Sequence, residues 1–153
     1  MCKIVATIVF ATILHIQNNI EEARRRYQRV LAIDARSPVA ANNLAWLYAE
    51  SGGNLDVAVD LALTARAALP DQPAVNDTLG WVYYKKDRAE QAIAPLRESV
   101  AKDPRNPVYQ YHLGLAYAKA GEKPKAREAL EQALKLDKDF DGADDARRVL
   151  GQL

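Results

Sequence analysis

The stretch PAVNDTLGWVYYKKDRAEQAIAPLRESVAKDPRN, residues 73–106, decides the fold. Its first half begins with a proline, which suits the first position of a helix, and its apolar residues recur at helical spacing. A turn is expected at Lys86-Asp87, followed by a second amphipathic helix that Asp103-Pro104 ends. Pro95 lies inside that second helix, where a local bend on the outer face is expected. The stretch therefore predicts two short helices folded into a hairpin.

The same layout recurs on both sides of this stretch. Prolines at 38, 73 and 107 open three segments at intervals of 35 and 34 residues. Each segment carries a Leu-small-x-x-Tyr pattern at the same place, and a small residue follows in its second half. The matching positions are Leu44-Ala45-x-x-Tyr48, Leu79-Gly80-x-x-Tyr83 and Leu113-Gly114-x-x-Tyr117, then Ala58, Ala92 and Ala126. Because one hairpin cannot bury its apolar face alone, such units are expected to stack.

This pattern resembles the tetratricopeptide repeat (TPR) family, whose motif reads W-x2-L-G-x2-Y, then A, then A-x3-F, then P. Ala41, Asn76 and Gln110 replace the tryptophan, and Lys138 stands where the last proline is expected. The resemblance implies an all-α fold, a right-handed α-solenoid of about four antiparallel helix hairpins in a single domain, residues 1–153. The expected units are 3–37, which is degenerate, 38–72, 73–106 and 107–139, with a capping helix over 140–153.

The amino-terminal stretch KIVATIVFATILHI, residues 3–16, is apolar and almost without charge. It is shorter than the roughly 20 residues of a membrane span, and it has no clear cleavage site for a secretory signal. A strand is a further alternative because the stretch is rich in β-branched residues. The repeat spacing favours a helix, since counting back from Ala23 by the 12 residues that separate Gly80 from Ala92 reaches Ala11.

In that alignment Phe10 takes the leucine position and Leu14 the tyrosine position, with a turn at Asn18-Asn19. One hairpin cannot bury so many apolar side chains. We therefore expect a second copy, a ligand segment, or a membrane (if the stretch is a signal-anchor) to cover part of it. The residues expected in self-association are Ile4, Ile8, Phe10 and Ile16.

Composition limits the partners that the chain can have. It is 49% hydrophobic and 27% charged, with 21 basic and 20 acidic residues and a net charge of +1. Nucleic-acid binding depends on neutralising many phosphates, so this balance argues against it. The single cysteine, Cys2, excludes an internal disulfide framework and a cysteine-based zinc site.

The residues that could support catalysis do not form a pattern. His15 and His112 fall in different units without metal-type neighbours, and His112 is expected at the surface or in the groove. No serine lies in a nucleophile elbow, and the isolated glycines form no phosphate-binding loop. We therefore expect no catalytic residue, no metal site and no cofactor.

In TPR proteins the first helix of each unit lines a concave groove. One stripe of these helices carries aromatic residues beside polar ones, as in surfaces that anchor a peptide. The predicted partner-binding residues are Asn42, Trp46, Asp77, Trp81, Tyr84, Lys85 and Tyr111. Packing of Trp46 and Trp81 between neighbouring helices is an equal alternative. The basic residues of the carboxylate clamp that some TPR modules use for acidic tails are missing.

The sequence thus predicts a non-catalytic module that binds a protein or peptide segment. The alternative is a scaffold that forms homo-oligomers through its apolar amino-terminal helix. An RNA-binding repeat is disfavoured by Glu50 and Asp77 in the groove as well as by the net charge. A cytoplasmic location is preferred, with export or membrane tethering as the alternative.

Overall fold

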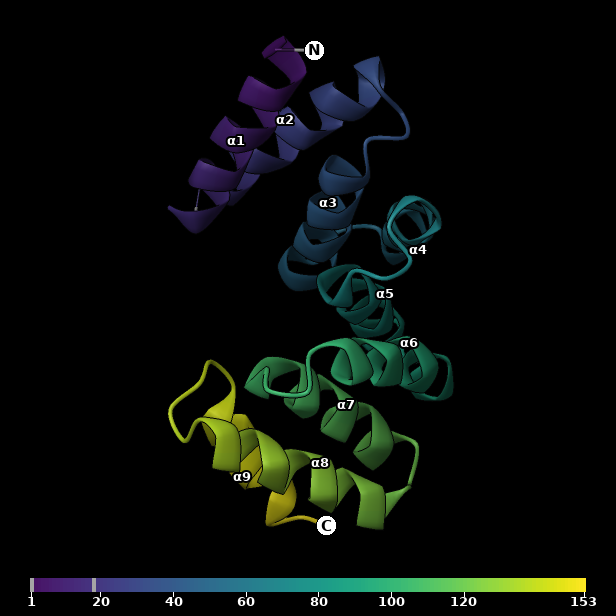
Figure 1. Ribbon diagram of the computed structural model, residues 1–153, viewed down its shortest axis with the longest axis vertical. Coiled ribbons are helices and arrows are strands. Elements are labelled where there is room, and N and C mark those ends of the chain that lie inside the picture. Colours follow the sequence, from purple (N-terminus) through teal and green to yellow (C-terminus); the bar gives the residue numbers. More distant parts are fainter. Residues whose placement is uncertain (1, 18) are drawn as a thin grey trace. The chain divides into compact units, whose positions relative to one another are not determined.

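The computed structural model describes residues 2–17 and 19–153, and within them it contains nine helices and no strand (Figure 1). The all-α prediction is therefore confirmed. The helices are α1 (Cys2–Ile16), α2 (Ile20–Ile33), α3 (Pro38–Ser51), α4 (Leu55–Ala68), α5 (Pro73–Lys85), α6 (Ala89–Lys102), α7 (Pro107–Lys119), α8 (Lys123–Leu136) and α9 (Ala143–Leu150).

The helices pair in chain order into antiparallel hairpins: α1 with α2, α3 with α4, α5 with α6, and α7 with α8. Contacts divide the chain into two compact units, residues 1–70 and 71–153. The first unit holds α1 to α4, and α2 packs on α3 within it. The second holds α5 to α9, where α7 packs on α5 and α6, and α9 packs on α7 and α8.

Local sequence sets where these helices begin. Pro38, Pro73 and Pro107 each open a helix, where the missing proline N–H leaves no hydrogen bond unmade. Asn106 caps α7, because its side-chain oxygen accepts hydrogen bonds from the backbone N–H groups of Val108 and Tyr109 at 3.0 and 3.4 Å.

The turns inside three hairpins use one left-handed residue each. Gly52 and Gly121 adopt φ values of 77° and 81°, which cost glycine little. Asp87 stands at the matching place between α5 and α6 with a φ of 65°. Aspartate tolerates this conformation better than most residues, so the predicted turn forms without a glycine.

The second unit is held together by the close approach of two helices in each hairpin. A Cβ atom on Gly80 would lie 2.4 Å from Cγ of Leu96 and 3.1 Å from the carbonyl oxygen of Ala92. Gly114 repeats the arrangement, with Leu130 Cγ at 2.6 Å from its virtual Cβ. Each leucine thus fills the space that its glycine leaves, and both leucines are fully buried.

The core of the first unit includes the amino-terminal helix. Ala11 and Leu14 of α1 are buried with Ala23, Tyr27 and Val30 of α2, and the core continues into α3. Ala11 and Leu14 are therefore core residues, as the alignment with the other repeats predicted.

Phe10 is the exception in this helix. It was expected in the core position of Leu79, yet it is exposed and lies under Arg26, whose guanidinium carbon is 4.7 Å from the ring centroid. The predicted turn at Asn18 lies outside the described residues.

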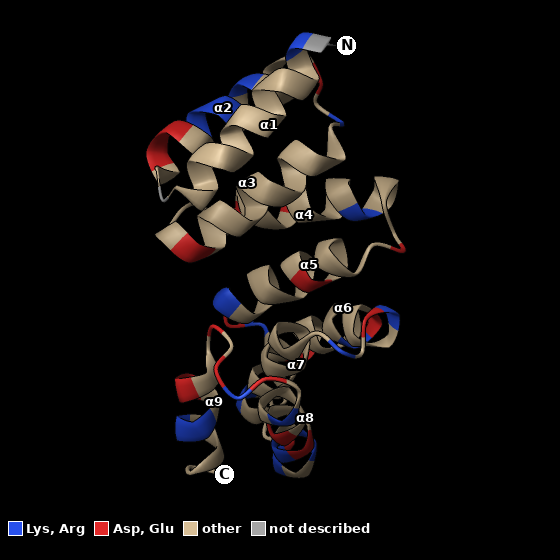
Figure 2. Ribbon diagram, turned by 60° about the vertical axis from the view of Figure 1, so that its left-hand side comes forward, with Lys and Arg blue, Asp and Glu red and all other residues tan. Residues whose placement is uncertain are grey.

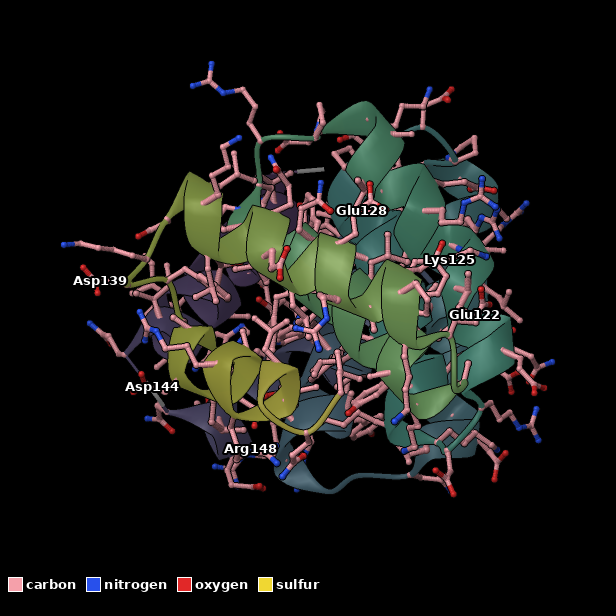
Figure 3. The ribbon with its side chains drawn as sticks, turned by 90° about the horizontal axis from the view of Figure 1, so that it is seen from below. Glu122, Lys125, Glu128, Asp139, Asp144 and Arg148 are labelled. Atoms are coloured by element: carbon pink, nitrogen blue, oxygen red, sulfur yellow. The ribbon has the colours of Figure 1, made fainter. Side chains whose placement is uncertain are left out.

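The carboxyl-terminal helix α9 covers the last hairpin, as predicted. Its Ala143 and Ala146 are buried, whereas Asp144, Arg147 and Arg148 are not. Figure 3 shows Asp144 and Arg148 on the outer side of this helix. The helix is amphipathic, and its apolar side packs on α7 and α8.

Pro95 does not lie on the outer face of its helix, where it was expected. Helix α6 runs continuously from Ala89 to Lys102 through Pro95, and the proline ring is buried rather than on the outer face. The helical period explains this: Pro95 follows Ala92 by three residues and Ser99 follows Pro95 by four, so all three lie on the buried side.

Replacing Gly80 by alanine should destabilise the protein by up to about 2 kcal/mol, since overpacking costs about 1 to 3 kcal/mol and helix propensity returns about 1 kcal/mol. Urea unfolding followed by circular dichroism would measure the difference. Gly151→Ala is the control, because its added Cβ would meet only ordinary contacts at 3.5 Å and beyond. Equal stability of the two variants would contradict this account of hairpin packing.

Candidate functional site

The second unit contains a ladder of rings supplied by α5, α7 and the loop before α9. Trp81 stacks on Tyr84 at 5.0 Å between centroids and on His112 at 4.0 Å. Tyr111 lies 5.5 Å from His112 and 5.5 Å from Phe140. Separations of this size are favourable for ring pairs, so the ladder is a rigid surface.

A buried contact between His112 and Asp77 lies beside the rings of the ladder. His112 Nδ1 is 2.9 and 3.1 Å from the two carboxylate oxygens of Asp77, and both residues are almost fully buried, at 3% and 4% exposure. An ionised carboxylate only accepts hydrogen bonds, so Nδ1 is the donor. The contact joins α5 to α7 and holds the imidazole ring against Trp81.

Tyr111 connects the ladder to α9. Its hydroxyl donates to Asp145 Oδ2 at 3.0 Å, and Asp145 also pairs with Arg148. Burial, followed by the hydrogen bond to Asp145 and its charge, raises the pKa of Tyr111 well above the ordinary tyrosine value. The phenol therefore stays protonated and keeps its role as donor. Gly142 allows this contact, since a Cβ there would lie 2.6 Å from the Tyr111 ring.

The accessible part of this surface lies at the carboxyl ends of α5 and α7. Lys85 and Lys119 are exposed, and Tyr84 is half-buried. Lys119 Nζ lies 4.7 Å above the Tyr84 ring and 2.6 Å from Asp87, while Lys85 Nζ lies 5.2 Å from the Trp81 ring centroid. Burial raises the pKa of Tyr84, so its hydroxyl is neutral at physiological pH. Cations thus lie beside aromatic rings on this surface.

In the first unit, Asn42 and Trp46 are half-buried on α3. Asn42 Nδ2 donates to Asn43 Oδ1 at 3.3 Å, and Asn43 Nδ2 donates to the Tyr27 hydroxyl at 3.0 Å. Thr12 Oγ1 lies 3.0 Å from the same hydroxyl. A polar chain thus connects α1, α2 and α3, and it orients Asn42.

The structure changes the roles of three predicted groove residues. Asp77, Trp81 and Tyr111 are buried, because Asp77 bonds to His112, Trp81 stacks on the same imidazole, and Tyr111 bonds to Asp145. They support the surface instead of forming its accessible part. His112 was expected at the surface or in the groove, and its burial beside Asp77 shows that the surface assignment was wrong.

Three residues of the site were missed: His112 as the partner of Asp77, together with Phe140 and Asp145. Asp77 and His112 are 35 residues apart, as are Tyr84 and Lys119. Each pair is separated by one repeat of 34 residues plus one position. The repeat period alone could therefore have predicted that these residues meet. Phe140 and Asp145 follow the last repeat, where the period no longer helps.

The residues proposed for self-association divide into two groups. Ile4 and Ile8 are half-buried and pack against the core of the first unit, so they are structural. Phe10 and Ile16 are exposed, and Ile16 is 80% accessible. Val5, Val9 and Ile13 of α1 are exposed as well.

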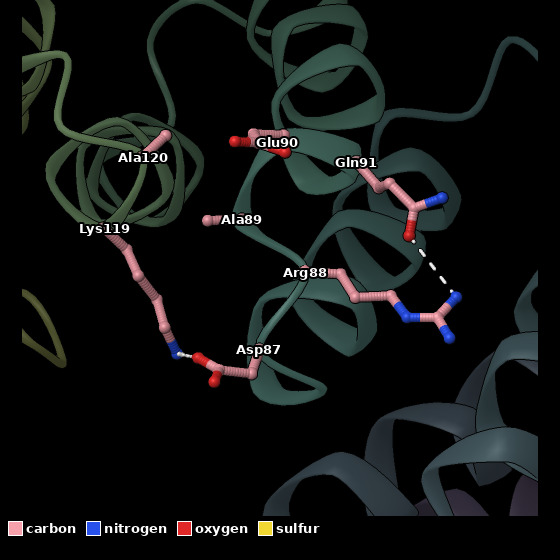
Figure 4. Close-up of a pocket in the computed structure, with 7 residues that line it drawn as sticks. All are labelled: Asp87, Arg88, Ala89, Glu90, Gln91, Lys119 and Ala120. Carbon is pink, nitrogen blue, oxygen red and sulfur yellow. Dashed lines mark hydrogen bonds and ion pairs between the residues drawn. The ribbon is translucent and has the colours of Figure 1, made fainter.

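A pocket of about 350 Å³ opens at the start of α6 (Figure 4). Its cations are already engaged, since Lys119 pairs with Asp87 at 2.6 Å and Arg88 Nη1 donates to Gln91 Oε1 at 3.4 Å. Glu90 also lines it. The pocket therefore presents no concentrated charge to a small ligand.

Two features of the described residues bear on other functions. No cluster of three or more His, Cys, Asp or Glu side chains in that part of the chain could hold a metal ion. Among the same residues, no helix is both long enough and apolar enough to cross a bilayer.

Comparison with known proteins identifies the family. The tetratricopeptide repeat model matches residues 17–73, 78–139 and 111–153, which together cover most of the chain. The chain belongs to the tetratricopeptide repeat family. The family assignment therefore confirms the resemblance seen in the three prolines and the Leu-small-x-x-Tyr pattern.

Two curated relatives match parts of the chain. TPR repeat-containing protein PA4667 of Pseudomonas aeruginosa is 28% identical over 98 residues, covering 64% of this chain and 16% of that protein. The general transcriptional corepressor ssn6 of Schizosaccharomyces pombe is 31% identical over 74 residues, covering 47% and 7%. This chain thus spans less than a fifth of the length of either relative.

Solved TPR structures share the fold. TTC0263, a TPR protein of Thermus thermophilus, aligns with a TM-score of 0.79 and 23% identity, covering 97% of this chain and 80% of that one. MamA of Desulfovibrio magneticus RS-1 aligns at 0.75 and 20%, covering 98% and 92%. YrrB, described as a TPR protein with an unusual peptide-binding site, aligns at 0.74 and 22%, covering 95% and 73%.

Replacing Asp77 by alanine should cost about 2 to 4 kcal/mol of unfolding free energy, because it leaves the buried His112 without its acceptor. Chemical denaturation would measure the loss. Asp71→Ala is the matched control: Asp71 is exposed and pairs with Lys102 at 2.6 Å, and exposed pairs of this kind contribute little. A loss no larger than that of the control would contradict a structural role for the Asp77–His112 pair.

Proposed function

We propose that this chain is a non-catalytic interaction module that binds a peptide or protein segment. Membership of the TPR family supports this class of function. The observation that carries it is the accessible cationic and aromatic surface of Tyr84, Lys85 and Lys119, which the buried ring ladder holds in place. A rigid aromatic side chain gives large contact area at little entropic cost, and the two lysines add positive charge beside it.

Asn42 and Trp46 are the proposed contacts on α3. Within the second unit, Asp77, Trp81 and Tyr111 act indirectly, by holding the ring ladder beside Tyr84 in place.

The Tyr84→Ala/Lys85→Ala double variant should lose at least about tenfold in affinity for the bound partner, since hot-spot truncations typically cost about 1 to 2 kcal/mol or more. The partner would be captured with the wild-type chain, purified, and its affinity measured by calorimetry. Tyr109→Ala/Lys135→Ala is the control, with the same residue types away from Tyr84. If both double variants remain helical and bind equally, the proposed surface is wrong.

A second candidate function is self-assembly, and the exposed face of α1 favours it. Val5, Val9, Ile13 and Ile16 are all at least 43% exposed and follow one another at spacings of four, four and three residues. They form one stripe. Within its described residues α1 has no acidic side chain, and Figure 2 shows it almost free of charge beside the strongly charged α2. A second copy of α1 is an occupant of matching character.

The Val9→Lys/Ile13→Lys variant should weaken such a dimer at least about tenfold, because each buried aliphatic side chain contributes roughly 1 kcal/mol or more. Sedimentation velocity over a concentration series would measure it. Val57→Lys is the control, since Val57 is also exposed but belongs to α4. A wild-type chain that stays monomeric throughout the series would end this proposal.

A further inference from the structure

A second groove, separate from the ring ladder, lies among α6, α7 and α8 of the second unit. Its volume is about 590 Å³, within the range of roughly 300 to 1,000 Å³ that is usual for ligand sites. It shares no residue with the surface of Tyr84, Lys85 and Lys119. The two surfaces can therefore be tested independently.

Helical spacing arranges the groove in three layers. The first layer combines two cations with a ring: Arg97 of α6, Lys125 of α8 and Tyr117 of α7. The second layer lies one helical turn from the first on each helix and is apolar: Ala101, Ala129 and Leu113. The third layer carries the amides of Gln110 and Gln132.

The cations of the first layer differ in how far they are neutralised. Lys125 pairs with Glu122 and lies over the Tyr117 ring at 5.4 Å from the centroid. Arg97 makes no ion pair or hydrogen bond with any described residue. It lies near Lys125: Glu122 raises the pKa of Lys125, and the positive charge of Arg97 acts in the opposite direction. This end of the groove therefore has one cation without a counter-charge.

The second layer leaves room for an apolar side chain. Ala101 and Ala129 face the groove from α6 and α8, and neither fills it, while Leu113 and the half-buried Val100 complete an apolar floor. The first and second layers are four residues apart along each helix, a rise of about 6 Å. In an extended peptide, side chains two residues apart lie on the same face and are separated by about 6.6 Å. The two spacings agree.

Glu128 fixes how a segment would lie. It projects from α8 one turn after Lys125, on the edge of that helix away from α9 (Figure 3). A second acidic side chain is unfavourable there, whereas a peptide N–H can donate to the carboxylate. The acidic group of a ligand is thereby restricted to the Arg97 end.

We propose that this groove binds an extended peptide segment of a partner protein in which an acidic side chain stands two residues from a branched apolar side chain. The proposal rests on the peptide-binding function proposed above and assigns it a second, separate surface. The carboxylate pairs with Arg97 and Lys125, and the apolar side chain occupies the space between Ala101 and Ala129. The amides of Gln110 and Gln132 hydrogen-bond to the peptide backbone beyond it.

The test uses the full chain and two capped peptides, acetyl-Gly-Ser-Glu-Ser-Leu-Ser-Gly-amide and the peptide with Glu and Leu exchanged, so that both chain directions are sampled. Binding is followed by amide chemical shifts of the labelled protein. At least one peptide should bind saturably with a dissociation constant below about 1 mM, a modest affinity for a short ligand. The shifts should centre on Arg97, Ala101, Ala129 and Gln132.

Three comparisons decide the outcome. Arg97→Gln should weaken binding about three- to tenfold, as expected for a partly exposed charge-assisted contact, whereas Arg127→Gln should leave it unchanged. Arg127 is the matched control because it lies on α8 outside the groove and pairs with Glu131 at 3.9 Å. Ala101→Leu fills the apolar layer from an exposed position, so it should abolish binding while the chain stays folded.

Replacing the peptide Glu by Gln should reduce affinity as much as Arg97→Gln does. Absence of saturable binding by both peptides would overturn the proposal, as would equal losses in Arg97→Gln and Arg127→Gln. Shifts centred on Tyr84 and Lys85 would also overturn it while supporting the first surface, because the peptide would then occupy that surface instead.

Discussion

The close approach of helices within each hairpin is the constraint on which the second unit depends. Gly80 admits Leu96, and Gly114 admits Leu130, at distances that a methyl group would not allow. In the α3–α4 hairpin the equivalent positions are alanines, Ala45 and Ala62, both fully buried. A glycine thus faces a leucine in two hairpins, and two alanines take those places in a third. In each hairpin a residue without a large side chain stands where the two helices approach each other.

Regular packing also explains why several expected contact residues became structural. Once α5 and α7 lie side by side, residues separated by one repeat plus one position meet across them, as Asp77 meets His112. A buried carboxylate is costly unless it is paired, and the imidazole donor satisfies it. Trp81 and Tyr111 then cover the imidazole from two sides. The surface available to a partner is consequently displaced to the carboxyl ends of the helices, where Tyr84 and Lys85 lie.

The sequence was sufficient for the helices, because prolines, turns and the Leu-small-x-x-Tyr pattern act locally and recur with a fixed period. It was not sufficient for individual side chains. Phe10 aligned with a core leucine but lies outside the core, since other apolar residues already supply the buried side of α1. A bend at Pro95 was expected on the outer face of its helix, yet the proline ring is apolar and lies on the buried side of α6. Non-local partners such as Asp145 follow from the docking of α9, which no periodic pattern encodes.

Charge shows most clearly how the surface divides between structure and binding. The net charge of +1 conceals local pairing along single helices: Arg24 with Glu21, Arg25 with Glu22, and Arg148 with Asp145. Such pairs contribute little to stability, but they leave those faces without a net attraction for a ligand. Arg97 lacks a partner of this kind among the described residues, and it stands beside an apolar floor. In a chain with so many locally paired charges, an unneutralised cation next to exposed apolar surface marks a place where a partner can supply the missing charge.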